Sequence, residues 1–164
     1  MLCFGLLAAS LPTIRPFDVG SSVQTAAAAA HSLDVLCFPP SGLWSASQFA
    51  ESLRSPRTAA VGAWTDDEAL VGMCFTELVL DECTLTNLAV HPTLRRRGLA
   101  EALLREAMVL ARTAGATRIM LEMRESNEAA RTLYAKCGFV CVGRRRRYYK
   151  RPDEDALLLD APLN

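Results

Sequence analysis

Apolar residues follow two different spacings along the chain, and these spacings alternate in a regular order. Alternating or continuous apolar runs predict strands at residues 11–17, 59–65, 69–80, 82–90, 119–123, 139–149 and 156–159. Apolar positions three and four residues apart predict helices at 99–114 and 128–137. Two earlier helices are predicted from the alanine run within 19–36 and from a capping box at Ser45 and Gln48. The order β-α-α-β-β-β-α-β-α-β-β predicts an α/β (α+β) fold with helices on the faces of one mixed sheet.

The connections between these elements predict how the strands pair. The second, third and fourth predicted strands are joined by short turns, which predicts an antiparallel meander. The strand at 119–123 follows a helix, so it is predicted to lie parallel to the strand at 82–90. Asn127 is a favourable N-cap for the next helix, and Gly138 followed by Phe139 predicts a Schellman-type end for it.

Composition limits the classes of protein that fit this chain. A length of 164 residues predicts one domain with a substantial core. The formal net charge is zero, and no apolar run reaches the roughly 20 residues of a membrane span, so we expect neither nucleic-acid nor membrane binding. The six cysteines show no metal-ligand or C-x-x-C spacing, so no metal site is expected. Their mostly apolar neighbours predict reduced, buried thiols in a cytoplasmic protein.

Residues 1–10, MLCFGLLAAS, precede the first predicted element. They are apolar but lack the positively charged start of a secretory signal peptide. We therefore expect an N-terminal extension, with a signal peptide as the alternative, followed by a domain that spans residues 11–160.

A basic segment with one glycine connects the strand at 82–90 to the helix at 99–114. Its sequence, NLAVHPTLRRRGLAEALL, leaves the strand at a His-Pro pair and passes three arginines before the helix begins. The first N–H groups of a helix have no partner within it, and the helix dipole adds partial positive charge there. Arginine forms forked hydrogen bonds to phosphate, and Gly98 allows close approach of the backbone. The segment is predicted to bind a phosphate-bearing ligand; the alternative is a solvated loop before a surface helix.

Three motifs together resemble one enzyme family. Arg95 to Ala100 fits Q/R-x-x-G-x-G/A, which resembles the acetyl-coenzyme A pyrophosphate loop of the GCN5-related N-acetyltransferases (GNAT). Residues 121–127, LEMRESN, and residues 133–139, LYAKCGF, continue the resemblance and are similar to the RimI branch, the ribosomal-protein-alanine N-acetyltransferases. The resemblance covers residues 11–160 and implies the GNAT acyl-CoA N-acyltransferase fold in a single domain.

The resemblance also implies roles for individual residues. Leu88, Ala89 and Val90 would bind the pantetheine arm of acetyl-CoA through their backbone, and Asn127 would contact the cofactor near its thioester. The residues implied for the pyrophosphate are Arg96, Arg97, Gly98, Leu99, Ala100 and Glu101. Glu122 would be the general base, and Tyr134 the general acid that protonates the departing thiolate. The implied reaction is acetyl transfer to the N-terminal amine, expected to be alanine, of a small-subunit ribosomal protein.

The residues themselves leave alternatives to these two roles. Glu122 is expected on the strand face opposite Ile119, Leu121 and Met123, where a carboxylate is either solvated or held for use. Tyr134 falls on the apolar stripe of its helix, so it can be a core residue whose hydroxyl also serves catalysis.

Amine chemistry favours an α-amine as the acceptor. An α-amine with a pKa of about 7.7–8.0 is roughly one-tenth neutral at pH 7, whereas a lysine amine near 10.4 is almost entirely protonated. An α-amine therefore needs only a modest base. No Cys/His pair suggests an acyl-enzyme, so we expect direct attack in a ternary complex. Lysine or small-amine acetylation, or a non-catalytic coenzyme A-binding or nucleic-acid-binding module, are the alternatives.

A second basic run lies near the C-terminus, at residues 144–150 with the sequence RRRRYYK. On a strand, alternate residues point to opposite faces, so we do not expect this run to form one basic patch. It is interpreted as a solvated strand with some residues near cofactor or substrate, rather than as a site for RNA.

Overall fold

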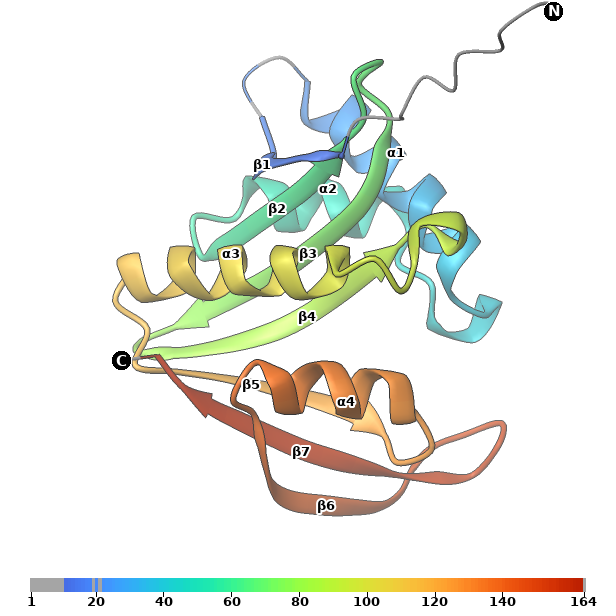
Figure 1. Cartoon of the computed structure of the whole chain (residues 1–164), viewed down its shortest axis with the longest axis vertical. Coiled ribbons are helices and arrows are strands. Elements are labelled where there is room, and N and C mark those ends of the chain that lie inside the picture. The colour runs from blue at the N-terminus through green and yellow to red at the C-terminus, as the bar shows by residue number, and fades with distance from the viewer. Residues whose placement is uncertain (1–10, 19, 21, 164) are drawn as a thin grey trace, which may run out of the picture.

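The computed structural model describes residues 11–18, 20 and 22–163, so the predicted extension at residues 1–10 lies outside the described residues. Seven strands form one sheet in the order β1-β2-β3-β4-β5-β7-β6 (Figure 1). The strands are β1 Thr13–Pro16, β2 Thr58–Trp64, β3 Leu70–Val79, β4 Glu82–Val90, β5 Arg118–Arg124, β6 Val140–Tyr149 and β7 Glu154–Pro162. The helices are α1 Val23–Cys37, α2 Ala46–Arg54, α3 Leu99–Thr113 and α4 Glu128–Lys136, with short 3-10 turns at Pro40–Gly42 and Pro92–Leu94.

The predicted order of elements and the predicted strand pairing are confirmed. β2, β3 and β4 form the antiparallel meander, and β4 lies parallel to β5. The last strand is longer than predicted, because it pairs with β5 as far as Pro162, opposite Arg118. Within the described residues, no helix is long and apolar enough to cross a membrane.

Helices cover both faces of the sheet and enclose two apolar cores. On one face, α3 lies over β2 to β4 and α4 lies over β5 and β7 (Figure 1). On the other face, α1 and α2 lie over β2 to β4, and their core contains an aromatic group made of Phe17, Phe49 and Phe75. Among the described residues, α1 and α2 lie over β2 to β4 rather than over β5, β7 and β6.

Local sequence fixes where two of the helices begin or end. Ser45 and Gln48 form the predicted capping box at the start of α2. At the end of α4, Gly138 has φ +88°, and the N–H of Phe139 donates to the carbonyl of Tyr134 at 3.0 Å. The N–H of Gly138 donates to the carbonyl of Ala135 at 3.1 Å, and the two bonds form the predicted Schellman motif. The motif holds the last turn of α4, which carries Tyr134, against the sheet.

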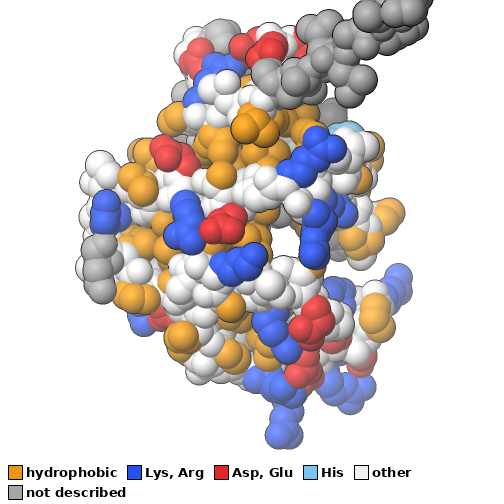
Figure 2. All heavy atoms as spheres, viewed as in Figure 1, with side chains coloured by type: hydrophobic (Ala, Val, Ile, Leu, Met, Phe, Trp, Pro, Cys, Tyr) orange, Lys and Arg blue, Asp and Glu red, His pale blue; other side chains and the backbone are white. Residues whose placement is uncertain are grey.

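The parallel strands β4 and β5 separate along their length. They pair only at Glu82–Arg118, Cys83–Ile119 and Thr84–Met120, although both continue well beyond these positions. Figure 1 shows the two strands diverging toward the side where α3 and α4 begin, and Figure 2 shows the molecule hollowed there, with basic side chains along the upper rim. Where the strands separate, the backbone groups on the facing edges of β4 and β5 have no strand partner, although the other edges still pair with β3 and β7.

A β-bulge accounts for this separation. The register of β3 and β4 passes from Thr76–Leu85 to Phe75–Asn87, so Thr86 is an extra residue in β4. Its hydroxyl donates to the carbonyl of Phe75 at 3.1 Å. A bulge bends its strand and increases the twist. Because Thr86 follows shortly after Thr84, the last residue of β4 paired with β5, the bend turns the end of β4 away from β5.

Candidate active site

The loop between β4 and α3 forms a row of free N–H groups. Gly98 is the N-cap of α3 in the left-handed conformation, with φ +81°, and Arg96 also has positive φ, at +63°. Ala102 is the first helical residue whose N–H donates into the helix, to the carbonyl of Gly98 at 3.0 Å. Within the described part of the chain, no backbone acceptor is found for the N–H groups of residues 96–101. The loop therefore has the donors that an anion requires.

The arginines of this loop differ in their partners. Arg96 and Arg97 are exposed, and neither makes an ion pair with another described residue. Arg95 instead turns back to β4, where its Nε donates to the carbonyl of Val90 at 3.1 Å. Arg96 and Arg97 are thus the two guanidinium groups of the loop that remain available to an anionic ligand.

Glu101 and Ala100 lie in the first turn of α3. The carboxylate of Glu101 accepts from Arg105 at 2.9 Å, and the same arginine donates to the carbonyl of Lys136 at 3.2 Å. This contact ties the start of α3 to the end of α4. Any contact of Glu101 with a phosphate would therefore use its N–H. Ala100 and Leu99 are partly buried against the core, as is normal for the first turn of a packed helix.

The end of β4 lines the opening between the strands. The N–H of His91 donates to the carbonyl of Val71 in β3, so the alternation of an antiparallel ladder turns the backbone groups of Val90 toward β5. The Val90 carbonyl accepts from Arg95 and, at 3.3 Å, from the thiol of Cys37. Of the backbone groups expected to bind pantetheine at Leu88, Ala89 and Val90, this carbonyl already has protein partners.

Glu122 lies near the middle of β5, on the face opposite Ile119, Leu121 and Met123, as predicted. Its side chain is 28% exposed, and Nη1 of Arg145 in β6 lies 2.7 Å from its Oε1. The carboxylate is therefore partly exposed and ion-paired. Arg145 could not be recognised as its partner from local patterns, because the contact crosses β7, the strand between β5 and β6.

Tyr134 lies on the other face of β5, within the core under α3 and α4. The residue is 8% exposed, and its ring centroid lies 5.5 Å from that of Phe139. Burial raises the pKa of the phenol well above its usual range, with smaller contributions from nearby groups that include Cys74 and Tyr149. The phenol therefore keeps its proton at every pH used for an enzyme assay.

Tyr149 is a residue of this region to which the sequence analysis assigned no role. It ends β6, and the guanidinium of Arg124 lies 4.3 Å from its ring centroid. Burial raises the pKa of Tyr149, and the next largest cause is the charge of Glu122. Tyr149 is thus within electrostatic reach of both Glu122 and Tyr134.

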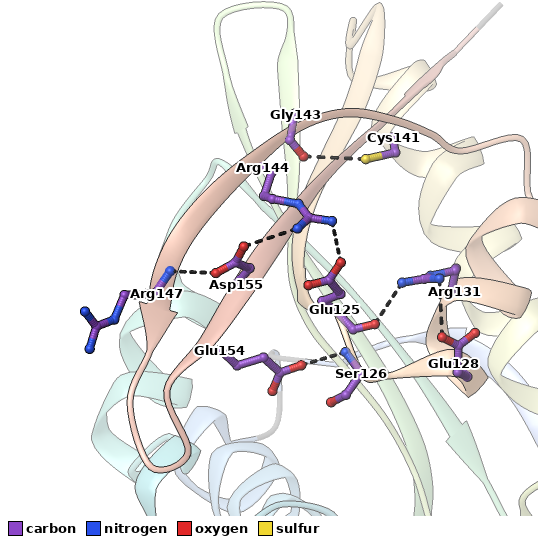
Figure 3. Close-up of polar contacts among 10 residues, drawn as sticks. All are labelled: Glu125, Ser126, Glu128, Arg131, Cys141, Gly143, Arg144, Arg147, Glu154 and Asp155. Carbon is purple, nitrogen blue, oxygen red and sulfur yellow. Dashed lines mark hydrogen bonds and ion pairs between the residues drawn. The ribbon is translucent and has the colours of Figure 1, made fainter.

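Polar contacts fix the turn between β5 and α4 against the β6–β7 hairpin (Figure 3). Asn127 caps α4 by accepting from the N–H of Ala130 at 3.1 Å, as predicted. The preceding N–H, of Ser126, donates to Glu154 of β7 at 2.6 Å. Arg144 of β6 pairs with Glu125 in this turn and with Asp155, 3.3 Å away. The start of α4 is therefore held by side chains of two strands.

The basic run in β6 departs from strict alternation. The register passes from Arg145–Ala156 to Tyr149–Glu154, so β6 bulges between these positions, and Arg147 has φ +50°. The expectation that residues 144–150 alternate between two faces is wrong over this bulge. Arg144, Arg145 and Arg147 each pair with a carboxylate, which neutralises most of the run.

A buried carboxylate anchors the loop between α1 and α2. Asp34 of α1 is 0% exposed, and it accepts from Nδ2 of Asn87 at 2.9 Å and from the N–H of Trp44 at 2.8 Å. His31 adds a 2.7 Å bond from Nδ1 to the carbonyl of Trp44. Oδ1 of Asn87 is buried and has no hydrogen-bond partner among the described residues. This network, which the sequence did not indicate, ties the loop to β4 beside the opening.

Among the described residues, no group of three or more His, Cys, Asp and Glu side chains is arranged to hold a metal ion. The five described cysteines are free, and Cys74, Cys83 and Cys137 are buried, as expected.

A helix start with free N–H groups thus lies beside the opening between the parallel strands β4 and β5, and comparison with known proteins shows the fold to be that of the GNAT acyltransferases. The Acetyltransferase (GNAT) family matches residues 27–139, so the chain belongs to this family of N-acetyltransferases, which take the acetyl group from acetyl-CoA.

Within this family, the chain is similar to several individual N-acetyltransferases. The chain is 39% identical over 102 residues to the "[Ribosomal protein bS18]-alanine N-acetyltransferase" of Salmonella typhimurium, a match that covers 61% of this chain and 69% of that protein. A Bacillus subtilis relative is 35% identical over 121 residues, which cover 74% of this chain and 80% of that protein. The crystal structure of the Escherichia coli ribosomal-protein-S18-alanine N-acetyltransferase superposes with a TM-score of 0.81 at 31% identity, over 93% of this chain and 94% of that chain.

Proposed function

We propose that this enzyme transfers an acetyl group from acetyl-CoA to the N-terminal α-amine, an alanine, of a small-subunit ribosomal protein of the bS18 type. The observation that carries the proposal is the opening between β4 and β5, which has the free N–H row at one edge and the partly exposed Glu122 on β5. The names of the relatives from Salmonella and Escherichia coli support the choice of acceptor. Such an acceptor implies that the enzyme acts in the cytoplasm.

Acetyl-CoA fits the residues that border the opening. The free N–H groups of residues 96–101, with Arg96 and Arg97, would hold the pyrophosphate. The edge of β4 that faces away from β3, at Leu88, Ala89 and Val90, would hold the pantetheine arm, and Asn127 would lie near the thioester. The bound cofactor supplies the activated acetyl group, and the protein has to position the amine and move two protons.

The proposed mechanism is direct attack. The neutral amine attacks the thioester carbonyl, a C–N bond forms, and the C–S bond breaks. The thiolate that leaves takes a proton or hydrogen bond from the hydroxyl of Tyr134, and the acylated nitrogen loses its extra proton to Glu122, directly or through a water. Because burial keeps Tyr134 protonated, the phenol is present as a donor throughout the assay range. Glu122 and Tyr134 therefore serve opposite ends of the transfer.

The acceptor class is tested with a matched set of peptides. One peptide begins with a free alanine and carries an internal lysine; the second has the same sequence with a blocked N-terminus; the third begins with a bulky residue. We expect acetylation of the first peptide at its α-amine, located by fragment mass spectrometry, and little modification of the second. Equal acetylation of lysine in the blocked peptide, or release of coenzyme A without any peptide product, would contradict the proposal.

A further inference from the structure

Glu122 has a charged partner that its expected role as general base does not account for. The ion pair with Arg145 joins two side chains that are 28% and 53% exposed, at 2.7 Å. The guanidinium of Arg145 also lies 5.4 Å from the ring centroid of Tyr148, which supports it from β6. The carboxylate of Glu122 therefore has a guanidinium partner while part of it remains exposed.

The other charged groups around Glu122 are already paired. On β5, Arg124 pairs with Glu154 at 3.0 Å and covers Tyr149. Leu158 is the residue of β7 opposite Glu122 in register. Asn87 of β4 is uncharged and donates to the buried Asp34 of α1. Among the described residues, Arg145 is therefore the one charge that pairs directly with Glu122.

A paired carboxylate and a bare one treat an incoming amine differently. About nine-tenths of an α-amine is ammonium at pH 7, and the ammonium form cannot attack. A bare carboxylate attracts ammonium and so favours the unreactive form, since opposite charges in contact attract each other even near a protein surface. A carboxylate paired with a guanidinium still accepts a hydrogen bond but exerts little net attraction on a cation.

We propose that Arg145 is a positioning residue that neutralises Glu122, so that the site discriminates against the ammonium form of the acceptor and holds the partly exposed carboxylate in place for the neutral amine. The inference rests on the proposed function, because it requires an α-amine acceptor. It predicts that loss of Arg145 makes the acceptor bind more tightly and react more slowly, a combination that loss of a merely structural residue would not give.

The test compares Arg145→Gln with a charge-matched control in the same strand, Arg146→Gln, since Arg146 makes no ion pair among the described residues. Initial rates are measured with saturating acetyl-CoA and an alanine-starting peptide from pH 6.5 to 9.5. At pH 6.5 we expect Arg145→Gln to lower the KM for peptide about threefold and to lower kcat about tenfold. Both effects should shrink toward pH 9.5, where the amine is neutral without help. Arg145→Lys should restore most of kcat, and Arg146→Gln should match the wild type.

The results distinguish failure of the role of Arg145 from failure of the proposed α-amine acetylation. If the wild type acetylates the peptide but Arg145→Gln raises KM, or behaves like Arg146→Gln at every pH, the role of Arg145 is wrong and the proposed function stands. If the wild type acetylates no α-amine, the proposed function fails and the inference fails with it. Thermal unfolding checks that the variants fold; Arg145→Met, which keeps an aliphatic stem over Tyr148, replaces the Gln variant if that one is unstable.

Discussion

Glu122 and Tyr134 lie on opposite faces of β5, with Glu122 partly exposed and Tyr134 in the core under α3 and α4. Side chains on opposite faces of a sheet can reach the same substrate bond only where the sheet is interrupted. The bulge at Thr86 provides such an interruption, because it separates the end of β4 from β5. Under the proposed function, acetyl-CoA would enter from the helical face and the amine from the face of Glu122, and each of the two residues would carry one proton transfer.

Tyr134→Phe should remove the donor to the leaving thiolate while keeping the packing of the ring. General acid–base catalysis is typically worth about 100- to 10,000-fold, so we expect turnover to fall within that range with acetyl-CoA affinity unchanged. Because burial raises the pKa of this phenol, its proton is retained and the loss should be constant from pH 6.5 to 9.5. Turnover near that of the wild type, with chemistry shown to be rate-limiting, would make Tyr134 a core residue only.

Glu122→Gln should show a different pH dependence. The amide cannot take the extra proton of the attacking nitrogen, so turnover should fall most at low pH, where little solvent base is present to take that proton instead. As pH rises toward 9.5, hydroxide takes this proton more readily and the deficit should shrink. The measurement is kcat against pH with a saturating alanine-starting peptide. A deficit of equal size across the whole range would argue that Glu122 orients the acceptor rather than removing its proton.

Gly98→Val should weaken cofactor binding through the backbone. An added Cβ meets no atom within 4 Å, but φ of +81° is unfavourable for a β-branched residue, so the loop should change conformation and move its N–H groups. Such strain costs about 1–3 kcal/mol, and we expect acetyl-CoA affinity to drop about tenfold or more.

Gly115→Val is the matched control for this loop. Gly115 has φ +98° and equally open space, but it follows the far end of α3. Both variants should lose similar stability, and only Gly98→Val should lose affinity in calorimetric titration. Unchanged acetyl-CoA affinity of a folded Gly98→Val protein would show that the phosphate loop is assigned wrongly.

The sequence predicted the fold better than it predicted the site, and particular residues show why. Periodicity, caps and the Gly138 stop are local signals, so every helix and strand was predicted in its order. The bulge at Thr86 has no glycine or proline to mark it, and the pairing of Arg145 with Glu122 depends on register across a third strand. A second bulge, before Tyr149, breaks the alternation expected for the basic run. Such non-local geometry is decided by packing.

Acidic pH should weaken the link between the β6–β7 hairpin and the turn before α4. Hydrogen bonds from Ser126, followed by Arg124, lower the pKa of Glu154. Because the pKa of Glu154 is lower in the folded state, the carboxylate stabilises the fold at pH values above its unfolded-state pKa, near 4.5. This stabilisation is lost as pH falls through the folded-state pKa. The melting temperature of the wild type should therefore fall more steeply on acidification than that of Glu154→Gln. Glu128→Gln, which removes an exposed carboxylate of α4, should follow the wild type.

Asp34→Ala should destabilise the fold more than any surface ion pair does. The substitution leaves the side-chain NH2 group of Asn87 and the N–H of Trp44 without their shared acceptor in a buried place. Each of the two unsatisfied buried donors costs about 1–3 kcal/mol, so we expect a loss of about 2–6 kcal/mol in denaturant unfolding. Asp153→Ala, which removes exposed ion pairs to Arg147 and Lys150, should cost less than about 1 kcal/mol. Because Asp34 holds the α1–α2 loop beside the opening, the variant should also raise the KM for peptide while acetyl-CoA affinity is kept. Equal stability losses in the two variants would show that the buried network does not anchor this loop.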